Sequence, residues 1–305
     1  MPVNIPDTLP AIEALKKENI FVIDSTRASH QDIRPLRIAI LNLMPVKVTT
    51  ETDLIRLLSN TPLQLEIDLV KITDHSSKNT SEEHMQSFYV DFNLIKHRKY
   101  DGLIVTGAPV EQLEYEDVTY WNELKEIFDW AKTNVQSSLF ICWASMAALY
   151  HYYGVPKYPL EKKVFGVFHH TLSDPKLPIF RGFDDEFHVP HSRFSEVHRE
   201  DIAKIPDLEI ISESDEAGVY MAKDRANRQI FVTGHSEYAP LTLDEEYKRD
   251  LAKGLPMDPP KHYYRKNDPS KQPVVKWRSQ ANLFFQNWLN YYVYQETPYN
   301  IEEIR

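Results

Sequence analysis

Short apolar runs alternate with helix-length segments through the first half of the chain, and this alternation constrains the fold more than any other feature. The run at residues 36–43 (LRIAILNL) is rich in branched side chains and ends at Met44-Pro45, which is typical of a buried strand. The strand-like runs are 36–43, 63–72, 100–109 and 137–142, and the helix-like segments are 49–59, 81–95, 117–133 and 143–153. This order predicts βαβ units and therefore an α/β fold with a doubly wound, mostly parallel sheet.

The second half of the chain changes character after Gly154. Its strand-like runs are shorter and lie at 164–169, 187–192, 218–221 and 229–234. They predict an antiparallel extension of the same sheet, so that residues 1–305 form one domain. The stretch 256–272 is rich in proline and charge and predicts a loop-rich surface segment that reaches about residue 276. A C-terminal helix is predicted over 277–292, packed back through its aromatic residues.

Charge and cysteine content argue against several classes of function. With 35 Lys+Arg and 45 Asp+Glu, the formal net charge is −10, which disfavours nucleic acid as a partner. No window approaches the ~18 consecutive apolar residues of a membrane span, and the start lacks a signal-peptide pattern, so we expect a cytoplasmic protein without a membrane partner. The single cysteine, Cys142, excludes an internal disulfide framework and multi-cysteine metal sites. The 12 histidines, which include His169, His170, His188 and His191, lack a spacing such as His-Glu-x-x-His, so no metal is assigned.

Cys142 stands at the predicted junction between a strand and the helix that follows it. Enzymes with α/β folds expose nucleophiles at such junctions, at the carboxyl edge of the sheet. The unpaired N–H groups and positive dipole at the start of the helix favour a thiolate and stabilise an oxyanion. Free cysteine is also among the most buried residue types, so a packing role between Ile141 and Trp143 stays open on position alone.

A second chemical signal is the segment Gly234-His235-Ser236-Glu237, which follows a strand-like run. Side chains two apart in an extended segment point to the same side, so Glu237 can hold the His235 ring while its other nitrogen faces a thiol. We therefore predict a Cys-His-Glu triad, because a cysteine needs such a base to become a thiolate near neutral pH. Taken alone, the His-x-Glu pair would pass as a solvated turn. Gly107 ends another strand-like run, where its neighbouring N–H groups are placed to complete an oxyanion hole.

The order of these features resembles the class I glutamine amidotransferase fold, which has a flavodoxin-like core. The resemblance rests on the strand with its glycine turn, the strand-end cysteine, and a His-x-Glu pair about ninety residues later. Amidotransferases favour glycines two residues before and after the cysteine, whereas this chain has Phe140 and Ala144 at those positions. A glutaminase that hands ammonia to a synthetase, and a non-enzymatic sensor with the same fold, are the alternatives.

A more specific resemblance is to the homoserine O-acyltransferase family of methionine biosynthesis. The motifs that carry it are MPVNIP, ILNLMPVK, TGAPVE, FICWASMAAL, FGVF, FHVPHSR and VTGHSEY, which span nearly the whole chain. The resemblance implies acyl transfer from acyl-CoA to Cys142 and then to the side-chain hydroxyl of L-homoserine, with free CoA released first. It also implies that Cys142 carries the acyl thioester, that His235 is the base, and that Glu237 orients His235.

The same resemblance implies residues that bind the substrate. Arg249, in a helix predicted over 244–253, would clamp the homoserine carboxylate, a planar anion that suits a bidentate guanidinium. Lys163 and Ser192 would bind substrate near the acyl and amino-acid pocket, and Ser192 would also bear on acyl specificity. The segment 42–47, at the same sheet edge, is expected to offer main-chain donors and a lysine. Without the resemblance, these three side chains would pass as a solvated helix charge, a surface lysine and a loop serine.

Glu111 is the expected determinant of the acyl donor. Family members with glycine after Gly-Ala-Pro-Val tend to use succinyl-CoA, and those with a carboxylate there use acetyl-CoA. Two carboxylates about 4 Å apart repel by roughly 4 kcal/mol at an intermediate dielectric constant, so Glu111 disfavours succinyl. We therefore expect acetyl transfer, with the succinyl-CoA reaction, and a Glu111 that faces water, as the alternatives. No resident cofactor is expected, and the resemblance implies a homodimer.

Overall fold

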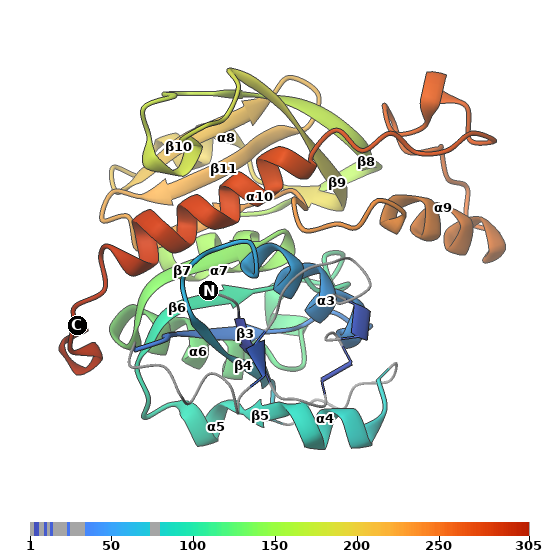
Figure 1. Cartoon of the computed structure of the whole chain (residues 1–305). Coiled ribbons are helices and arrows are strands. Elements are labelled where there is room, and N and C mark those ends of the chain that lie inside the picture. The colour runs from blue at the N-terminus through green and yellow to red at the C-terminus, as the bar shows by residue number, and fades with distance from the viewer. Residues whose placement is uncertain are drawn as a thin grey trace.

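The computed structural model of the protein describes residues 3–5, 9–10, 13–14, 23–24, 34–73 and 80–304 (Figure 1). Half of the opening motif MPVNIP therefore lies outside the described residues. The described residues form one sheet of 12 strands, in which β5 (Tyr89–Asp91) pairs with β4 and the others follow the order β2 (Ile23–Asp24), β1 (Val3–Ile5), β4 (Leu65–Lys71), β3 (Leu36–Leu41), β6 (Tyr100–Val105), β7 (Val135–Ile141), β12 (Gln229–Val232), β11 (Gly218–Asp224), β10 (Leu208–Ser214), β8 (Tyr158–Leu172) and β9 (Glu186–Glu196).

The two parts of this sheet differ in strand direction. Every pairing from β2 to β12 is parallel, and so is the pairing of β5 with β4. The pairings from β12 to β9 are antiparallel and form the extension that the sequence predicts. The predicted doubly wound, mostly parallel α/β sheet is thus confirmed. The sequence did not reveal β10, because its apolar residues are interrupted by Glu209, Ser212 and Glu213.

Helices cover both faces of the parallel part because its strands are apolar on both sides. Ile38 and Ile40 pack in one core, and Ala39 and Leu41 pack in the other. The helical elements of the first core are α3 (Lys47–Leu58), α4 (Glu82–Phe88), η2 (Pro178–Phe180), α9 (Thr242–Ala252), α10 (Arg278–Asn287) and the π-helical segment η4 (Trp288–Tyr294). Those of the second are α5 (Phe92–Ile95), η1 (Tyr115–Asp117), α6 (Trp121–Asn134), α7 (Trp143–Tyr153) and α8 (Arg199–Ala203).

The C-terminal helix packs back on the sheet through aromatic residues, as the sequence predicts. It consists of α10 and η4, and α10 runs across the front of the molecule in Figure 1. Trp288 is fully buried and donates a hydrogen bond from Nε1 to Oγ of Ser137 at 3.0 Å. Gly102 makes room for this indole, because a Cβ at Gly102 would lie 3.0 Å from Cη2 of Trp288. In the described part of the chain, no helix combines the length and apolar character that a membrane crossing requires.

Two predicted segments differ from the structure. The helix-like segment 81–95 is interrupted, because Tyr89 and the two residues after it pair with β4 as a short strand. The stretch 256–272 is not simply a surface loop. The backbone of Lys261 forms hydrogen bonds with the backbone of Phe165 and Val167 in β8. Tyr263 and Tyr264 are buried, and the 3₁₀ turn η3 (Arg265–Asn267) follows them. A last turn, η5 (Ile301–Glu303), lies near the C-terminus.

The parallel strands bring their carboxyl ends to one edge of the sheet. Backbone bonds tie this edge together: the N–H of Thr106, after β6, donates to Leu41 of β3 at 3.1 Å, and the N–H of Cys142, after β7, donates to Val232 of β12 at 2.6 Å. The chain segments that follow these strands therefore lie side by side, as expected for ligand sites in open α/β sheets.

Candidate active site

Cys142 occupies a strained turn between β7 and α7. Its backbone angles are φ 51° and ψ −115°, in a region that residues other than glycine rarely adopt. Such a conformation costs about 1–3 kcal/mol and persists only where the surroundings enforce it. Here the bond to Val232 fixes the N–H of Cys142, and its carbonyl accepts a hydrogen bond from Oγ of Ser145 at 2.7 Å. The turn therefore holds the thiol at the N-terminal end of α7.

The glycines that amidotransferases favour around the cysteine are replaced by groups that pack in the core. Phe140 stacks on Phe231 of β12, with ring centroids 5.4 Å apart, and Ala144 is fully buried in α7. The close backbone approach comes instead from Gly107, after β6. A Cβ at Gly107 would lie 3.3 Å from Cβ of Cys142 and 3.7 Å from Cε1 of His235. Gly107 thus brings its main chain against the thiol and the imidazole together.

His235 lies between Cys142 and Glu237. Its Nδ1 lies 2.6 Å from Oε1 of Glu237, and Cys142 lies close enough to the ring to affect its pKa. Burial by itself lowers the pKa of His235, but the charges and hydrogen bonds of Cys142 and Glu237 outweigh it and raise the pKa well above its ordinary value. The His235 ring also stacks on Tyr238 at 4.1 Å between centroids. The structure therefore brings together the three side chains of the predicted triad, with the imidazolium form of His235 favoured.

Two of the other histidines that the sequence singles out form a buried pair. His170 and His191 are fully buried, and their Nε2 atoms lie 3.1 Å apart. Burial lowers the pKa of His170 to about 3 and lowers that of His191 well below its ordinary value, so both rings are neutral. Within the described ranges, no group of three or more His, Cys, Asp and Glu side chains is arranged to hold a metal ion.

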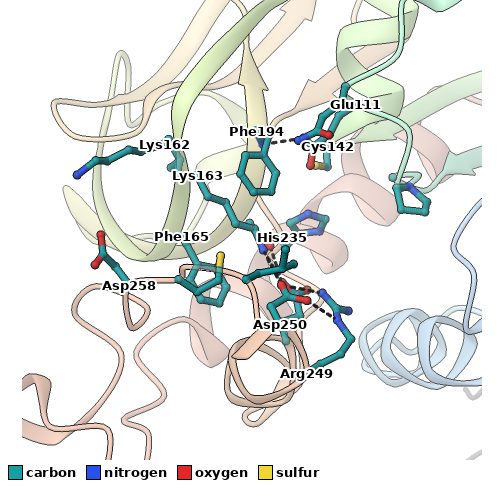
Figure 2. Close-up of a pocket in the computed structure, with 18 of the residues that line it drawn as sticks. Glu111, Cys142, Lys162, Lys163, Phe165, Phe194, His235, Arg249, Asp250 and Asp258 are labelled. Carbon is teal, nitrogen blue, oxygen red and sulfur yellow. Dashed lines mark hydrogen bonds and ion pairs between the residues drawn. The ribbon is translucent and has the colours of Figure 1, made fainter. Parts of the chain in front are cut away.

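A cavity of about 1570 Å³ opens over the thiol. Six of the predicted site residues line it: Cys142, His235, Glu111, Lys163, Ser192 and Arg249. Glu237 does not line the cavity and contacts the His235 ring. Figure 2 shows Cys142 and Glu111 at one end of this cavity and Arg249 at the other, with Lys163 between the two ends. The late stretch 255–259, which follows α9, also lines it. Predicted site residues that are up to 138 residues apart in sequence, from Glu111 to Arg249, thus share one site.

Glu111 faces the cavity and is held by the backbone of β9. Its Oε2 accepts a hydrogen bond from the N–H of Phe194 at 2.9 Å. Burial raises the pKa of Glu111, and this effect is opposed by the Phe194 hydrogen bond and by the charges of Lys163, His235 and Arg193. Glu111 is therefore only partly exposed, with one carboxylate oxygen bonded to the backbone of β9, and it lines the cavity near Cys142.

Glu246 of α9 is a site residue that the sequence analysis missed. Its Oε2 accepts a hydrogen bond from Oγ of Ser192 at 2.5 Å and lies 3.2 Å from Nζ of Lys163, and its Oε1 accepts from the hydroxyl of Tyr238 at 3.0 Å. Two of the predicted substrate-binding residues therefore meet on one carboxylate. A glutamate in a charged helix gives no sequence signal of this kind, and only its position three residues before Arg249 could have drawn attention to it.

Arg249 reaches the cavity from the same helix and is held by its neighbour. Its Nε and Nη2 bond to the two carboxylate oxygens of Asp250 at 2.8 and 3.1 Å, and this contact raises the pKa of Arg249. The Arg249 side chain is 54% exposed. Its remaining nitrogen, Nη1, carries no hydrogen bond to a residue of the described ranges and is open to a ligand.

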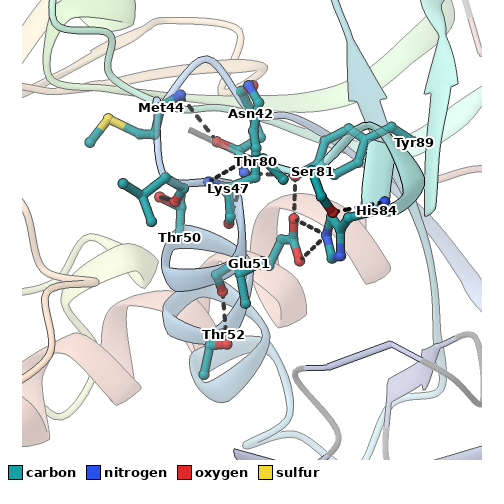
Figure 3. Close-up of polar contacts among 12 residues, drawn as sticks. Asn42, Met44, Lys47, Thr50, Glu51, Thr52, Thr80, Ser81, His84 and Tyr89 are labelled. Carbon is teal, nitrogen blue, oxygen red and sulfur yellow. Dashed lines mark hydrogen bonds and ion pairs between the residues drawn. The ribbon is translucent and has the colours of Figure 1, made fainter. Parts of the chain in front are cut away.

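A buried polar cluster supports the segment 42–47, where Met44 and Pro45 line the cavity (Figure 3). Glu51 of α3 is fully buried, accepts a hydrogen bond from the Tyr89 hydroxyl at 2.5 Å, and lies 3.0 Å from Nε2 of His84. The Nζ of Lys47 donates to the carbonyl of Asn42, and burial lowers the pKa of Lys47 to about 8. The expected lysine of this segment thus fixes the loop from within and does not line the cavity.

Comparisons with known proteins agree with this picture. Residues 2–299 match the family described as Homoserine O-succinyltransferase. A homoserine O-acetyltransferase of Phocaeicola vulgatus is 67% identical over 305 residues, and one of Acetivibrio thermocellus is 60% identical over 305 residues, with all of both chains covered in each case. A homoserine O-acetyltransferase of Brevibacillus brevis is 62% identical over 301 residues, which cover 99% of this chain and 98% of that one.

Solved structures with a similar backbone include two glutamine amidotransferases. One from Thermotoga maritima has a TM-score of 0.56 at 13% identity and covers 85% of this chain and 98% of its own. One from Methylobacillus flagellatus has a TM-score of 0.53 at 12% identity and covers 85% and 95%. At these identities the likeness shows the fold alone.

The chain has a class I glutamine amidotransferase-like fold, with Cys142, His235 and Glu237 together at the carboxyl edge of its sheet. Within that class, the chain belongs to the homoserine O-succinyltransferase family, because the match covers residues 2–299 and full-length relatives are more than half identical. The predicted resemblance to the homoserine O-acyltransferases is thereby confirmed.

Proposed function

We propose that this protein transfers the acetyl group of acetyl-CoA to the side-chain hydroxyl of L-homoserine, through an acetyl thioester on Cys142. The observation that carries the proposal is the strained Cys142 turn, with His235 and its partner Glu237 beside it under a large cavity. Relatives at 60–67% identity over the full chain are named homoserine O-acetyltransferases, which supports the same reaction.

In the first half-reaction, His235 takes the proton of the Cys142 thiol and Sγ attacks the carbonyl carbon of acetyl-CoA. The carbonyl oxygen becomes an oxyanion, which N–H groups at the start of α7 and at the turn of Gly107 would stabilise. The bond between this carbon and the CoA sulfur then breaks. The CoA sulfur takes the proton that His235 held, so free CoA leaves and the acetyl group stays on Sγ.

In the second half-reaction, His235 takes the proton of the homoserine hydroxyl, and the hydroxyl oxygen attacks the acetyl carbon. The bond to Sγ breaks, O-acetyl-L-homoserine leaves, and the sulfur recovers the proton from His235. Glu237 fixes the ring tautomer through Nδ1 and stabilises the imidazolium in both halves. In this scheme Arg249 binds the homoserine carboxylate, and Lys163 and Ser192 lie along the path between that end and the thiol.

The acetyl donor follows from Glu111. Its carboxylate is half-buried in the cavity wall near Cys142, where a succinyl thioester would carry a second negative charge. The family description names succinyl transfer, and the similar relatives named above are acetyltransferases, so donor choice varies within the family. The alternative for this chain is the same reaction with succinyl-CoA.

Release of free CoA thiol tests this function. It would be followed with acetyl-CoA and with succinyl-CoA, each with and without L-homoserine, for the wild type and for Cys142→Ala. We expect sustained release from acetyl-CoA that requires homoserine and is lost in the variant. A preference for succinyl-CoA would contradict the donor assignment alone, and glutamine hydrolysis without CoA release would indicate an amidotransferase.

The assembly and setting of the protein are further proposals. A homodimer is supported by the aromatic tail, where Tyr294 is 53% exposed and Tyr299 is 96% exposed. Sedimentation of the wild type against a variant with both tyrosines replaced by serine would test it. A cytoplasmic location and a reaction without a resident cofactor complete the proposed function.

A further inference from the structure

Glu246 holds an unusual position in the cavity wall. It is the point at which three elements meet, because Lys163 comes from β8, Ser192 from β9, and Tyr238 from the turn that carries His235. An ionised carboxylate offers about four acceptor positions. Three donors of the described residues occupy three of these positions, so one position on Oε1, the oxygen that binds Tyr238, is open. The Glu246 side chain is 15% exposed, and the part that is exposed lines the cavity.

The charges around Glu246 suit a ligand that is itself neutral overall. Glu246 and Asp250 supply two negative charges, and Lys163 and Arg249 supply two positive charges within the same contact network. A ligand with a net charge would upset this balance in a partly buried site, whereas a zwitterion would not. An amino acid needs a cation for its carboxylate and an anion for its ammonium group, and the two must be a few ångströms apart.

Helix geometry provides such a pair. Glu246 and Arg249 are three residues apart on α9, so they lie on one face of the helix, and both line the cavity. Arg249 keeps Nη1 open while Asp250 fixes the rest of its guanidinium. Tyr238, which donates to Glu246, stacks on His235 at 4.1 Å, so one side chain connects the anion to the proposed base.

We propose that Glu246 binds the α-ammonium group of homoserine, while Arg249 binds the carboxylate of the same molecule. This inference rests on the proposed function. Glu246 then selects an acceptor that is an amino acid over a plain hydroxy acid, and it orients the hydroxyl toward His235 by fixing the other end of the molecule. Ser192 and Lys163 contribute to the amino-acid subsite by holding the Glu246 carboxylate in place.

Two acceptors that differ only in the ammonium group test the proposal. L-Homoserine and 4-hydroxybutyrate would be compared as acceptors from acetyl-CoA, for the wild type and for Glu246→Gln. The variant keeps the size of the side chain and loses its charge. Because a hydrogen bond to a charged group contributes about 1.5–3 kcal/mol, we expect the preference for homoserine, as a ratio of kcat/KM values, to fall about 10- to 100-fold.

Controls separate this role from a structural one. Glu245→Gln removes the neighbouring charge, which is exposed on the same helix, and should leave the preference as in the wild type. Glu246→Asp keeps the charge and should restore part of the preference. An equal loss with both acceptors in Glu246→Gln, at an unchanged preference, would overturn the proposal and leave Glu246 as a support for Lys163 and Ser192. Failure of the wild type to acetylate Cys142 would instead overturn the proposed function.

Discussion

Replacement of Glu111 by glycine should redirect the protein toward a succinyl donor. The substitution removes a –CH₂–CH₂–COO⁻ group from the cavity near Cys142, and succinyl exceeds acetyl by –CH₂–COO⁻, so the vacated space matches the added group. The Phe194 N–H, 2.9 Å from the present carboxylate, becomes free to receive the succinyl carboxylate. Two charges about 4 Å apart at an effective dielectric constant of about 20 repel by roughly 4 kcal/mol, which corresponds to about a thousandfold in rate.

The assay is the ratio of kcat/KM for succinyl-CoA to that for acetyl-CoA, with homoserine saturating. We expect Glu111→Gly to raise this ratio about 100- to 1000-fold. Glu111→Gln loses the charge and keeps the size of the side chain, so it should raise this ratio less than Glu111→Gly does. The difference between the two variants separates the effect of charge repulsion from that of the vacated space. Burial raises the pKa of Glu111, so the wild type should discriminate less against succinyl-CoA as the pH falls and the carboxyl group is protonated. An unchanged ratio in Glu111→Gly would refute the reasoning.

Two further substitutions test the residues that surround His235. Glu237→Gln removes an anion that raises the pKa of His235 and holds its ring through Nδ1 at 2.6 Å, so kcat for acetyl transfer should fall about 10- to 100-fold at pH 7. An unchanged kcat would contradict the role of Glu237 in supporting the base. Gly234→Ala would place a Cβ 2.8 Å from Cγ1 of Val189 and from Nε2 of His191, and both of these side chains are buried. The substitution should therefore lower the free energy of unfolding, measured in urea, by about 1–3 kcal/mol. An unchanged free energy of unfolding would show that this turn has room to move.

The sequence predicts best what depends on local order along the chain. The alternation of strands and helices places Cys142 at the end of β7, and the spacing of two in His-x-Glu places Glu237 on the ring of His235. Both are short-range patterns, and the parallel pairing of β7 with β12 then brings them together. This is why the fold class and the contacts of the triad side chains could be predicted without a structure.

What the sequence does not predict depends on contacts between distant elements. Glu246 looks like a solvated helix charge until β8 and β9 bring Lys163 and Ser192 against it. Glu51 and His84 are likewise charged or polar residues of amphipathic segments, and only the packing of α3 beside α4 and β5 buries them together. Tyr89 breaks a helical pattern because its strand pairing and its bond to Glu51 outweigh local propensity.

The central claim is that Cys142 carries the acetyl group between the two substrates. It is tested most directly by the intact mass of the protein after mixing with acetyl-CoA, before and after addition of L-homoserine. The account predicts that the wild type gains the mass of one acetyl group on Cys142, that homoserine removes it within one turnover, and that Cys142→Ala never gains it. O-Acetylhomoserine formation by Cys142→Ala at the wild-type rate, or a Cys142 acetyl group that homoserine leaves in place, would contradict the account.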